Sequence, residues 1–163
     1  EVASKQQSDT TPTSLFPLPR GTVSVHVRHG DKYTEMTLQP FARYIEGAKD
    51  LFRWQPLSLS RTMFVSTEDA QVIREAATNA DGWVALYSDI PRHNSNGFEQ
   101  LRLADDITLL HLTQLLMALE CDAWVGTLAS NWNRLIDELR CVWVAKCSHP
   151  YKEVGDTWHD YHW

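Results

Sequence analysis

The sequence has few cysteines and no long apolar run, and both shortages exclude classes of protein. Only three of its 163 residues are cysteines, an odd number too small for a disulfide framework. Cys141 and Cys147 could pair with each other, whereas a buried thiol is the ordinary role for Cys121. No run of about 18 apolar residues occurs, so we expect no transmembrane helix and no membrane contact within this chain.

Basic charge is also in short supply. Fifteen Lys and Arg residues face 21 Asp and Glu residues, which gives a net charge of −6. Binding along a nucleic acid normally requires a basic face, so we expect no nucleic-acid partner, and any anion site must be local. Hydrophobic residues make up 43% of the chain and charged residues 22%, values typical of one globular domain.

Several binding motifs are missing as well. No glycine-rich dinucleotide fingerprint and no Walker loop occurs, so the usual NAD and ATP folds are not indicated. No pair of histidines has a convincing metal spacing together with a third ligand, and we predict no metal.

The order of the predicted elements indicates an α/β fold. Short apolar segments predict strands, and longer segments with apolar residues on one face predict helices. The alternation predicts a Rossmann-like parallel sheet with flanking helices on both faces. The expected strands are 23–27, 63–65, 83–87, 123–125 and 142–144. The expected helices are 40–53, about 68–78, 103–121 and 130–140. Thr67 is expected to cap the second of these helices. We assign residues 1–20 to a linker or extended lead-in, 21–147 to the domain and 148–163 to a polar, aromatic tail.

Polar clusters follow three of the predicted strands. They are 26–32 with Glu35 soon after, 66–69, and 126–131. Ligands of open parallel sheets bind beyond the carboxyl ends of the strands, so the three clusters should face one crevice. An Arg and a helix N-terminus can grip a diphosphate there. Each cluster also has a structural alternative: Arg28 and Asp31 as an ion pair and His26 as a core residue in the first, Thr67 with Asp69 as a helix cap in the second, and Ser130 as a helix cap in the third.

The ordered set of motifs resembles the α1,6-fucosyltransferases. Residues 25–32, followed by Thr34 and Glu35, are similar to the first motif of that family. Later segments resemble its further motifs in the same order, so the resemblance runs from about residue 23 to 140. Those segments are 64–69, 87–89 and 121–131.

The resemblance implies the carboxyl-terminal, donor-binding half of a two-domain GT-B type enzyme, whose amino-terminal domain is missing from this chain. It implies an inverting, metal-independent transfer of fucose from GDP-fucose to a glycan or glycoprotein acceptor, without a cofactor, in the secretory pathway lumen or Golgi. The isolated chain should be inactive or nearly so, because acceptor groups usually come from the other half.

The resemblance also implies residue roles. Arg28 would bind the β-phosphate and stabilise the leaving GDP. Glu35 would be the general base, with Lys32 tuning it, and would need burial or a nearby carboxylate to raise its pKa. Further donor-binding residues would be His26 near guanine or ribose, Ser130 on phosphate, and His29, Asp31, Glu68, Asp69, Gln114 and Thr127. His29 stands where the family has a second Arg, and Gln114 where a guanine-reading Asp is expected.

Three alternatives stay open. A protein O-fucosyltransferase-like enzyme shares the opening of the first motif. A histidine phosphatase would use Arg28-His29-Gly30, with His29 as the phosphorylated residue and His159-Asp160 as a later pair. A catalytically silent GDP-sugar binding module would bind the nucleotide and do nothing else.

Overall fold

The computed structural model describes residues 15–90, 92 and 105–155. Most of the predicted lead-in, most of the loop after residue 89 and the end of the tail, which includes His159-Asp160, lie outside the described residues.

Five strands form one parallel sheet. The strands are β1 (Val23–Val27), β2 (Thr62–Thr67), β3 (Val84–Leu86), β4 (Ala123–Gly126) and β5 (Tyr151–Glu153). Their order across the sheet is β3-β2-β1-β4-β5, and every neighbouring pair is parallel. The predicted α/β fold with a Rossmann-like parallel sheet is therefore confirmed.

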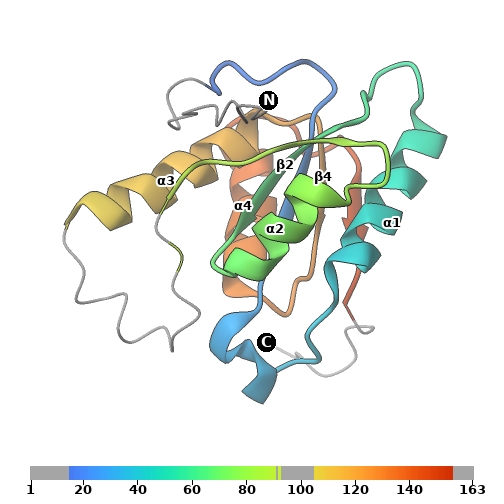
Figure 1. Ribbon diagram of the computed structural model, residues 1–163. Coiled ribbons are helices and arrows are strands. Elements are labelled where there is room, and N and C mark those ends of the chain that lie inside the picture. Colours follow the sequence, from blue (N-terminus) through green and yellow to red (C-terminus); the bar gives the residue numbers. More distant parts are fainter. Residues whose placement is uncertain (1–14, 91, 93–104, 156–163) are drawn as a thin grey trace, which may run out of the picture.

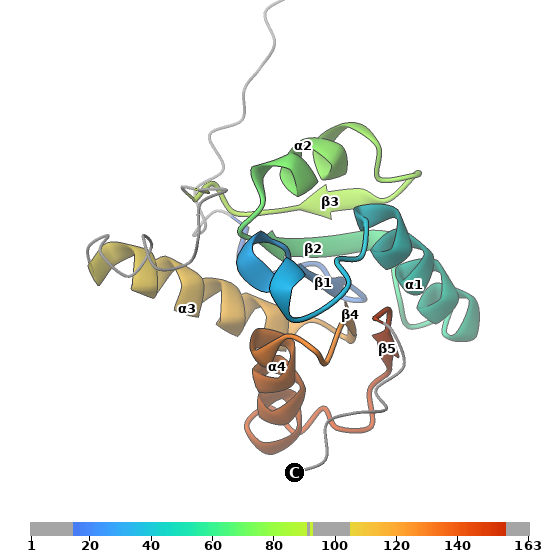
Figure 2. The ribbon, with the colours of Figure 1, turned by 90° about the horizontal axis from the view of Figure 1, so that it is seen from below.

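Helices cover both faces of this sheet (Figures 1 and 2). Helices α1 (Phe41–Trp54) and α2 (Ala70–Thr78) pack on one face, and α3 (Asp105–Glu120) and α4 (Asn131–Val142) pack on the other. Successive side chains of a strand point to opposite faces. Thus Met63 and Val65 join the core beneath α1 and α2, whereas Phe64 joins the core beneath α3 and α4.

The strand order reverses between β1 and β4, which makes this pair the switch point of the sheet. Ligands of such sheets bind outside the carboxyl ends of the strands at this point. A short 3-10 helix, η2 (Gly30–Thr34), follows β1 after two residues. Figure 2 shows η2 in front of the sheet, with α3 and α4 nearby on one side.

The prediction of a strand at 142–144 is wrong. Helix α4 continues through Val142, and both Val142 and Trp143 are exposed instead of entering the sheet. The guanidinium of Arg140 donates to the carbonyl oxygens of Lys146 and His149 at 3.0 and 2.9 Å, which folds the chain back.

The edge strand β5 lies farther along the chain. It pairs with β4 at residues 151–153, so the sheet extends past residue 147, into the segment assigned to the tail. The open question of the cysteines is also answered: Cys141 and Cys147 form a disulfide across the turn after α4, and Cys121 is a buried free thiol.

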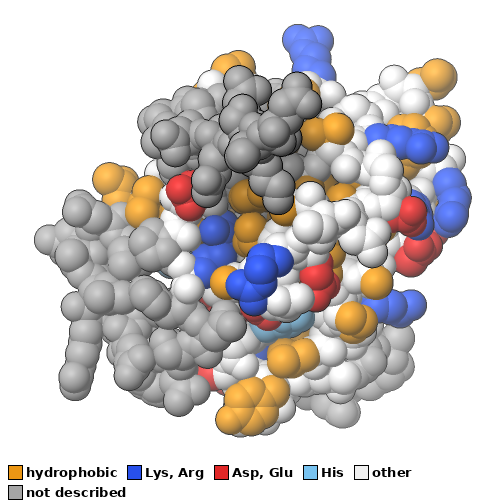
Figure 3. Space-filling view, in the orientation of Figure 1, with side chains coloured by type: hydrophobic (Ala, Val, Ile, Leu, Met, Phe, Trp, Pro, Cys, Tyr) orange, Lys and Arg blue, Asp and Glu red, His pale blue; other side chains and the backbone are white. Residues whose placement is uncertain are grey.

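Charges of both signs are interspersed on the face that carries α1 and α2 (Figure 3). Lys49 of α1, for example, pairs with Glu46 one turn away and with Asp81 beyond α2. Within the described residues, no helix combines the length and the apolar character needed to cross a membrane.

Candidate functional site

A cavity of about 420 Å³ opens at the carboxyl edge of β1, β2 and β4. It lies at the switch point, between η2, α3 and the start of α4. All three polar clusters contribute to its wall, so the parallel sheet brings them together as the sequence pattern predicts. Its lining residues are His26, Arg28, Lys32, Thr67, Glu68, Thr108, His111, Leu112, Gln114, Ser130, Asn131 and Trp132.

Arg28 brings a fixed positive charge to this cavity. Its Nη1 donates to Oε1 of Glu68 at 2.7 Å, and its Nη2 donates to Oδ1 of Asp31 at 2.5 Å. The structural ion pair named as an alternative therefore exists, but the guanidinium lines the cavity as well. A guanidinium has more N–H groups than these two bonds use, so donors remain for a ligand. The carboxylates hold Arg28 in one orientation.

Glycine at position 30 makes this arrangement possible. Gly30 has a φ of +57°, a backbone conformation that side-chain-bearing residues rarely adopt. A Cβ at this position would lie 3.2 Å from Oε1 of Glu68 and 3.6 Å from Nη1 of Arg28. The turn after β1 thus brings backbone directly against the Arg28–Glu68 pair.

Two buried polar atoms on the cavity wall have no hydrogen-bond partner among the described residues. They are Nε2 of His26 and Oγ of Ser130. Buried polar atoms are almost always paired, so such atoms call for an explanation such as a bound ligand. Ser130 is the N-cap of α4 but makes no side-chain cap bond. Its hydroxyl is therefore left for the cavity, next to the N–H groups that the first turn of a helix leaves unpaired.

His26 is electrically neutral at physiological pH. Burial, followed by the charges of Arg28 and His111, lowers the pKa of His26 to about 3. Its Nδ1 lies 3.0 Å from Oγ of Ser66, a buried hydroxyl on β2. A neutral imidazole offers one donor and one acceptor, so His26 can recognise a neutral polar group but adds no charge.

His29 and Asp69 do not line the cavity. Nδ1 of His29 lies 2.8 Å from Oδ2 of Asp69, and Nε2 of His29 lies 2.8 Å from the carbonyl oxygen of Gln39. Both ring nitrogens thus face acceptors in the fold. Asp69, and not Thr67, is the N-cap of α2, since its Oδ1 accepts from the N–H of Gln71 at 2.7 Å.

This geometry argues against a histidine phosphatase. A phosphohistidine forms only when a ring nitrogen presents its lone pair to the phosphate, and both ring nitrogens of His29 are engaged in the fold.

Thr127 also points away from the cavity. It is buried, and its Oγ1 accepts from the N–H of Ala129 at 3.4 Å on the side of Gly155.

Lys32 and Glu35 form an ion pair at the mouth of the site. The ammonium of Lys32 is buried and lines the cavity, whereas the side chain of Glu35 is 60% exposed. Its hydrogen bond and charge interaction with Lys32 lower the pKa of Glu35. The raised pKa that a general base requires is therefore not present in this structure, and the catalytic role of Glu35 stays a prediction.

Helix α3 contributes the far wall. Gln114 is buried and its Nε2 donates to Oγ of Ser88 at 2.5 Å, which leaves its amide oxygen as an acceptor. His111 lies about one helical turn earlier on the same face, and burial, opposed by Glu68, lowers its pKa. The sequence motifs did not single out His111. Its spacing of three residues from Gln114 is the signal that could have revealed it.

Among the residues that the structure describes, no group of three or more His, Cys, Asp or Glu side chains is placed to hold a metal ion.

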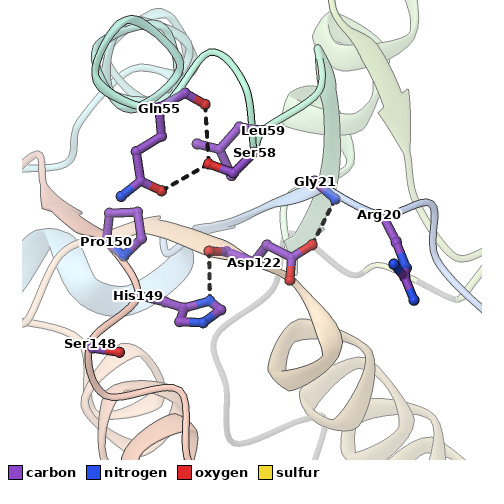
Figure 4. A pocket seen from close by; sticks show the side chains of 9 residues that line it. All are labelled: Arg20, Gly21, Gln55, Ser58, Leu59, Asp122, Ser148, His149 and Pro150. Atoms are coloured by element: carbon purple, nitrogen blue, oxygen red, sulfur yellow. Dashed lines mark hydrogen bonds between the residues drawn. The ribbon is translucent and has the colours of Figure 1, made fainter.

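A second cavity, of about 500 Å³, lies at the opposite, amino edge of the sheet (Figure 4). Oδ2 of Asp122 accepts from the N–H of Gly21 at 2.6 Å, and Nδ1 of His149 lies 3.3 Å from the carbonyl oxygen of Asp122. These bonds join the starts of β1, β4 and β5. None of the unpartnered buried atoms noted among the described residues belongs to its lining.

The fold has a counterpart among solved structures. The chain is similar to the crystal structure of POFUT1 in complex with GDP, with a TM-score of 0.53 and 14% sequence identity over 89% of this chain. It spans 45% of the length of that solved chain. The protein therefore shares its α/β fold with part of the POFUT1 structure. No protein-family model matches the sequence, and no curated protein matches it.

Proposed function

We propose that the cavity at the β1–β4 switch point binds the GDP moiety of GDP-fucose, and that the chain is the donor-binding domain of an inverting fucosyltransferase. The observation that carries this proposal is the convergence of the unpartnered Nε2 of His26 and Oγ of Ser130 beside the guanidinium of Arg28. A neutral hydrogen-bonding group, a hydroxyl at a helix N-terminus and a fixed cation together suit a nucleoside diphosphate.

Each end of the nucleotide has a complementary wall. Arg28 and the first turn of α4 would hold the diphosphate, and the guanidinium would stabilise the charge that grows on the leaving GDP. The amide oxygen of Gln114, which the bond to Ser88 leaves as an acceptor, suits the N–H donors of guanine. The similar solved structure, POFUT1 in complex with GDP, supports the same ligand class.

The acceptor side is proposed more coarsely. Both the α1,6 type, which the motif resemblance favours, and a protein O-fucosyltransferase-like type fit this donor site. In either case Glu35 would take the proton of the acceptor hydroxyl, and for this the acceptor must displace Lys32 from the ion pair. The Cys141–Cys147 disulfide supports a secretory-lumen location, since structural disulfides persist in oxidising compartments.

The experiment that tests the donor site is a calorimetric titration with GDP, GDP-fucose and GDP-mannose. We expect GDP compounds to bind and fucose to be preferred over mannose. Folded protein that binds none of the three would contradict the proposal. Fucose-transfer assays with the chain alone then distinguish two cases. A donor domain that needs its partner half shows no transfer, whereas a self-sufficient enzyme transfers fucose.

A silent GDP-sugar binding module is the second candidate, and it is favoured because the contact with Lys32 lowers the pKa of Glu35, the residue proposed as the base, instead of raising it. Glu35→Gln in the full-length protein distinguishes the two. Loss of transfer with unchanged GDP binding supports the enzyme, whereas a full-length protein that binds GDP-fucose but transfers nothing supports the module.

A further inference from the structure

The turn between β4 and α4 is braced by a carboxylate that no sequence motif singled out. Glu153 is the last residue of β5. Its Oε2 accepts from the backbone N–H of Leu128 at 2.9 Å and from the hydroxyl of Tyr151 at 3.0 Å. Its Oε1 accepts from the N–H of Gly155 at 2.8 Å. One carboxylate thus ties the edge strand to the turn that leads into Ser130.

The backbone around Glu153 lies unusually close to this turn. A Cβ at Gly155 would lie 2.3 Å from Oγ1 of Thr127, so only glycine fits there without a shift. The N–H of Val154 donates to the carbonyl oxygen of Gly126 at 3.0 Å and extends the ladder between β4 and β5. Segment 153–155 and segment 126–128 therefore behave as one packed unit.

The other side of the turn is held by α4. A Cβ at Gly126 would lie 2.3 Å from Oδ1 of Asn133, and Nδ2 of Asn133 donates to the carbonyl oxygen of His26 at 3.4 Å. Within the turn, the N–H of Ser130 donates to the carbonyl oxygen of Thr127 at 3.0 Å. Bracing from both sides leaves the Ser130 hydroxyl at the cavity wall without a partner.

We propose that Glu153 is a positioning residue for the diphosphate. By accepting the N–H of Leu128, it sets the orientation of the 127–130 turn, and so aims the Ser130 hydroxyl and the first turn of α4 at the phosphates. This inference rests on the proposed function of the cavity. Glu153 does not line the cavity, and its negative charge by itself would repel a diphosphate. Positioning and charge therefore predict opposite effects when the carboxylate is removed.

The test compares Glu153→Ala and Glu153→Gln with the unmodified chain in titrations with GDP and with guanosine. Loss of a hydrogen bond to a charged acceptor predicts about tenfold weaker GDP binding for Glu153→Ala. Guanosine binding should not change, because guanosine carries no phosphate. Glu153→Gln keeps an acceptor oxygen for Leu128 and should restore GDP affinity to within about twofold. Tyr151→Phe, which leaves the bond to Leu128 in place, is the matched control.

Two further measurements keep the outcomes distinct. Combined with Ser130→Ala, the Glu153→Ala effect on GDP affinity should be less than additive, since part of the Glu153 effect passes through the Ser130 hydroxyl. Without ligand, the Leu128 amide should exchange its hydrogen faster in Glu153→Ala than in the unmodified chain. Tighter GDP binding by both Glu153 variants would show that only charge matters, and an equal loss of GDP and guanosine binding would show a merely structural role. Either result overturns the proposal.

The two proposals also fail separately. If the unmodified chain binds no GDP, the donor-site function is overturned, and with it the positioning of a diphosphate, whatever the exchange rates are. If the unmodified chain binds GDP but Leu128 exchange is the same in Glu153→Ala, only the role assigned to Glu153 is overturned.

Discussion

Replacing Arg28 by alanine should remove most of the affinity for GDP while leaving that for guanosine intact. The structure places the Arg28 guanidinium on the cavity wall between two carboxylates, with Glu68 at 2.7 Å and Asp31 at 2.5 Å. The variant therefore loses the cation that would grip the diphosphate. It also leaves two carboxylates without their shared partner at the edge of the same cavity.

The expected size of the effect follows from these contacts. Hydrogen bonds to charged groups contribute about 1.5 to 3 kcal/mol each. Two N–H groups of Arg28 that bind the diphosphate should therefore contribute at least about 3 kcal/mol to the free energy of binding. At about 1.4 kcal/mol for each factor of ten, the dissociation constant for GDP should rise by about 100-fold. Repulsion from the unpaired Glu68, whose side chain is only 11% exposed, adds to this loss.

Calorimetry with GDP and guanosine measures the effect. Arg53→Ala is the matched control: it removes the same charge from an exposed side chain of α1 that pairs with Asp50 at 2.8 Å, away from the cavity. The double variant Arg28→Ala/Glu68→Gln should recover part of the lost affinity, because it removes the repulsion but not the missing grip. GDP binding by Arg28→Ala that equals that of Arg53→Ala would refute the assignment of Arg28 to the diphosphate.

Three further outcomes are expected. Gly30→Ala should lower the free energy of unfolding by more than Gly82→Ala does in thermal or denaturant unfolding. Both positions have positive φ, but a Cβ at Gly30 meets Glu68 whereas one at Gly82 meets nothing within 4 Å; equal losses would show that the clash does not matter. The free energy of unfolding should fall by about 2 kcal/mol as the pH is lowered from 6.5 to about 5. In this range His26 of the unfolded chain binds a proton, whereas buried His26 of the folded chain, with its pKa of about 3, stays neutral. The slope should be clearly smaller in His26→Gln, with His111, whose pKa burial also lowers, supplying part of the remainder; an unchanged slope would assign it to groups other than His26. Reduction of the Cys141–Cys147 disulfide should lower the free energy of unfolding by about 2 kcal/mol, because the unfolded chain then gains the conformational entropy that the short closed loop had removed. The double serine variant should not respond to reductant, and an equal response would place the effect elsewhere.

Much of the site was predictable because parallel sheets obey a simple geometric rule. Alternating strand and helix patterns indicated the order of the elements, and the carboxyl ends of parallel strands share one edge. That rule was enough to bring His26, Glu68 and Ser130 to one cavity.

Other parts of the site could not be found from local patterns. His29 stood in the motif next to Arg28, yet its ring turns to Asp69 and Gln39 and does not line the cavity. Which way a side chain points after a strand ends depends on the turn that follows, here through Gly30 at a φ of +57°. The pKa of Glu35 likewise depends on the position of the Lys32 ammonium in space.

The edge of the sheet also shows the difference between what local sequence patterns predict and what tertiary contacts decide. The short apolar run at 142–144 predicted a strand, but a strand forms only where a neighbouring strand offers its hydrogen bonds. Segment 151–153 takes that place beside β4, while Arg140 and the Cys141–Cys147 disulfide turn the chain toward it. Local periodicity and motif order thus determine the α/β class and the residues that reach the switch point. Burial, side-chain direction and the bracing by Glu153 arise only from contacts between distant segments, which no local pattern encodes.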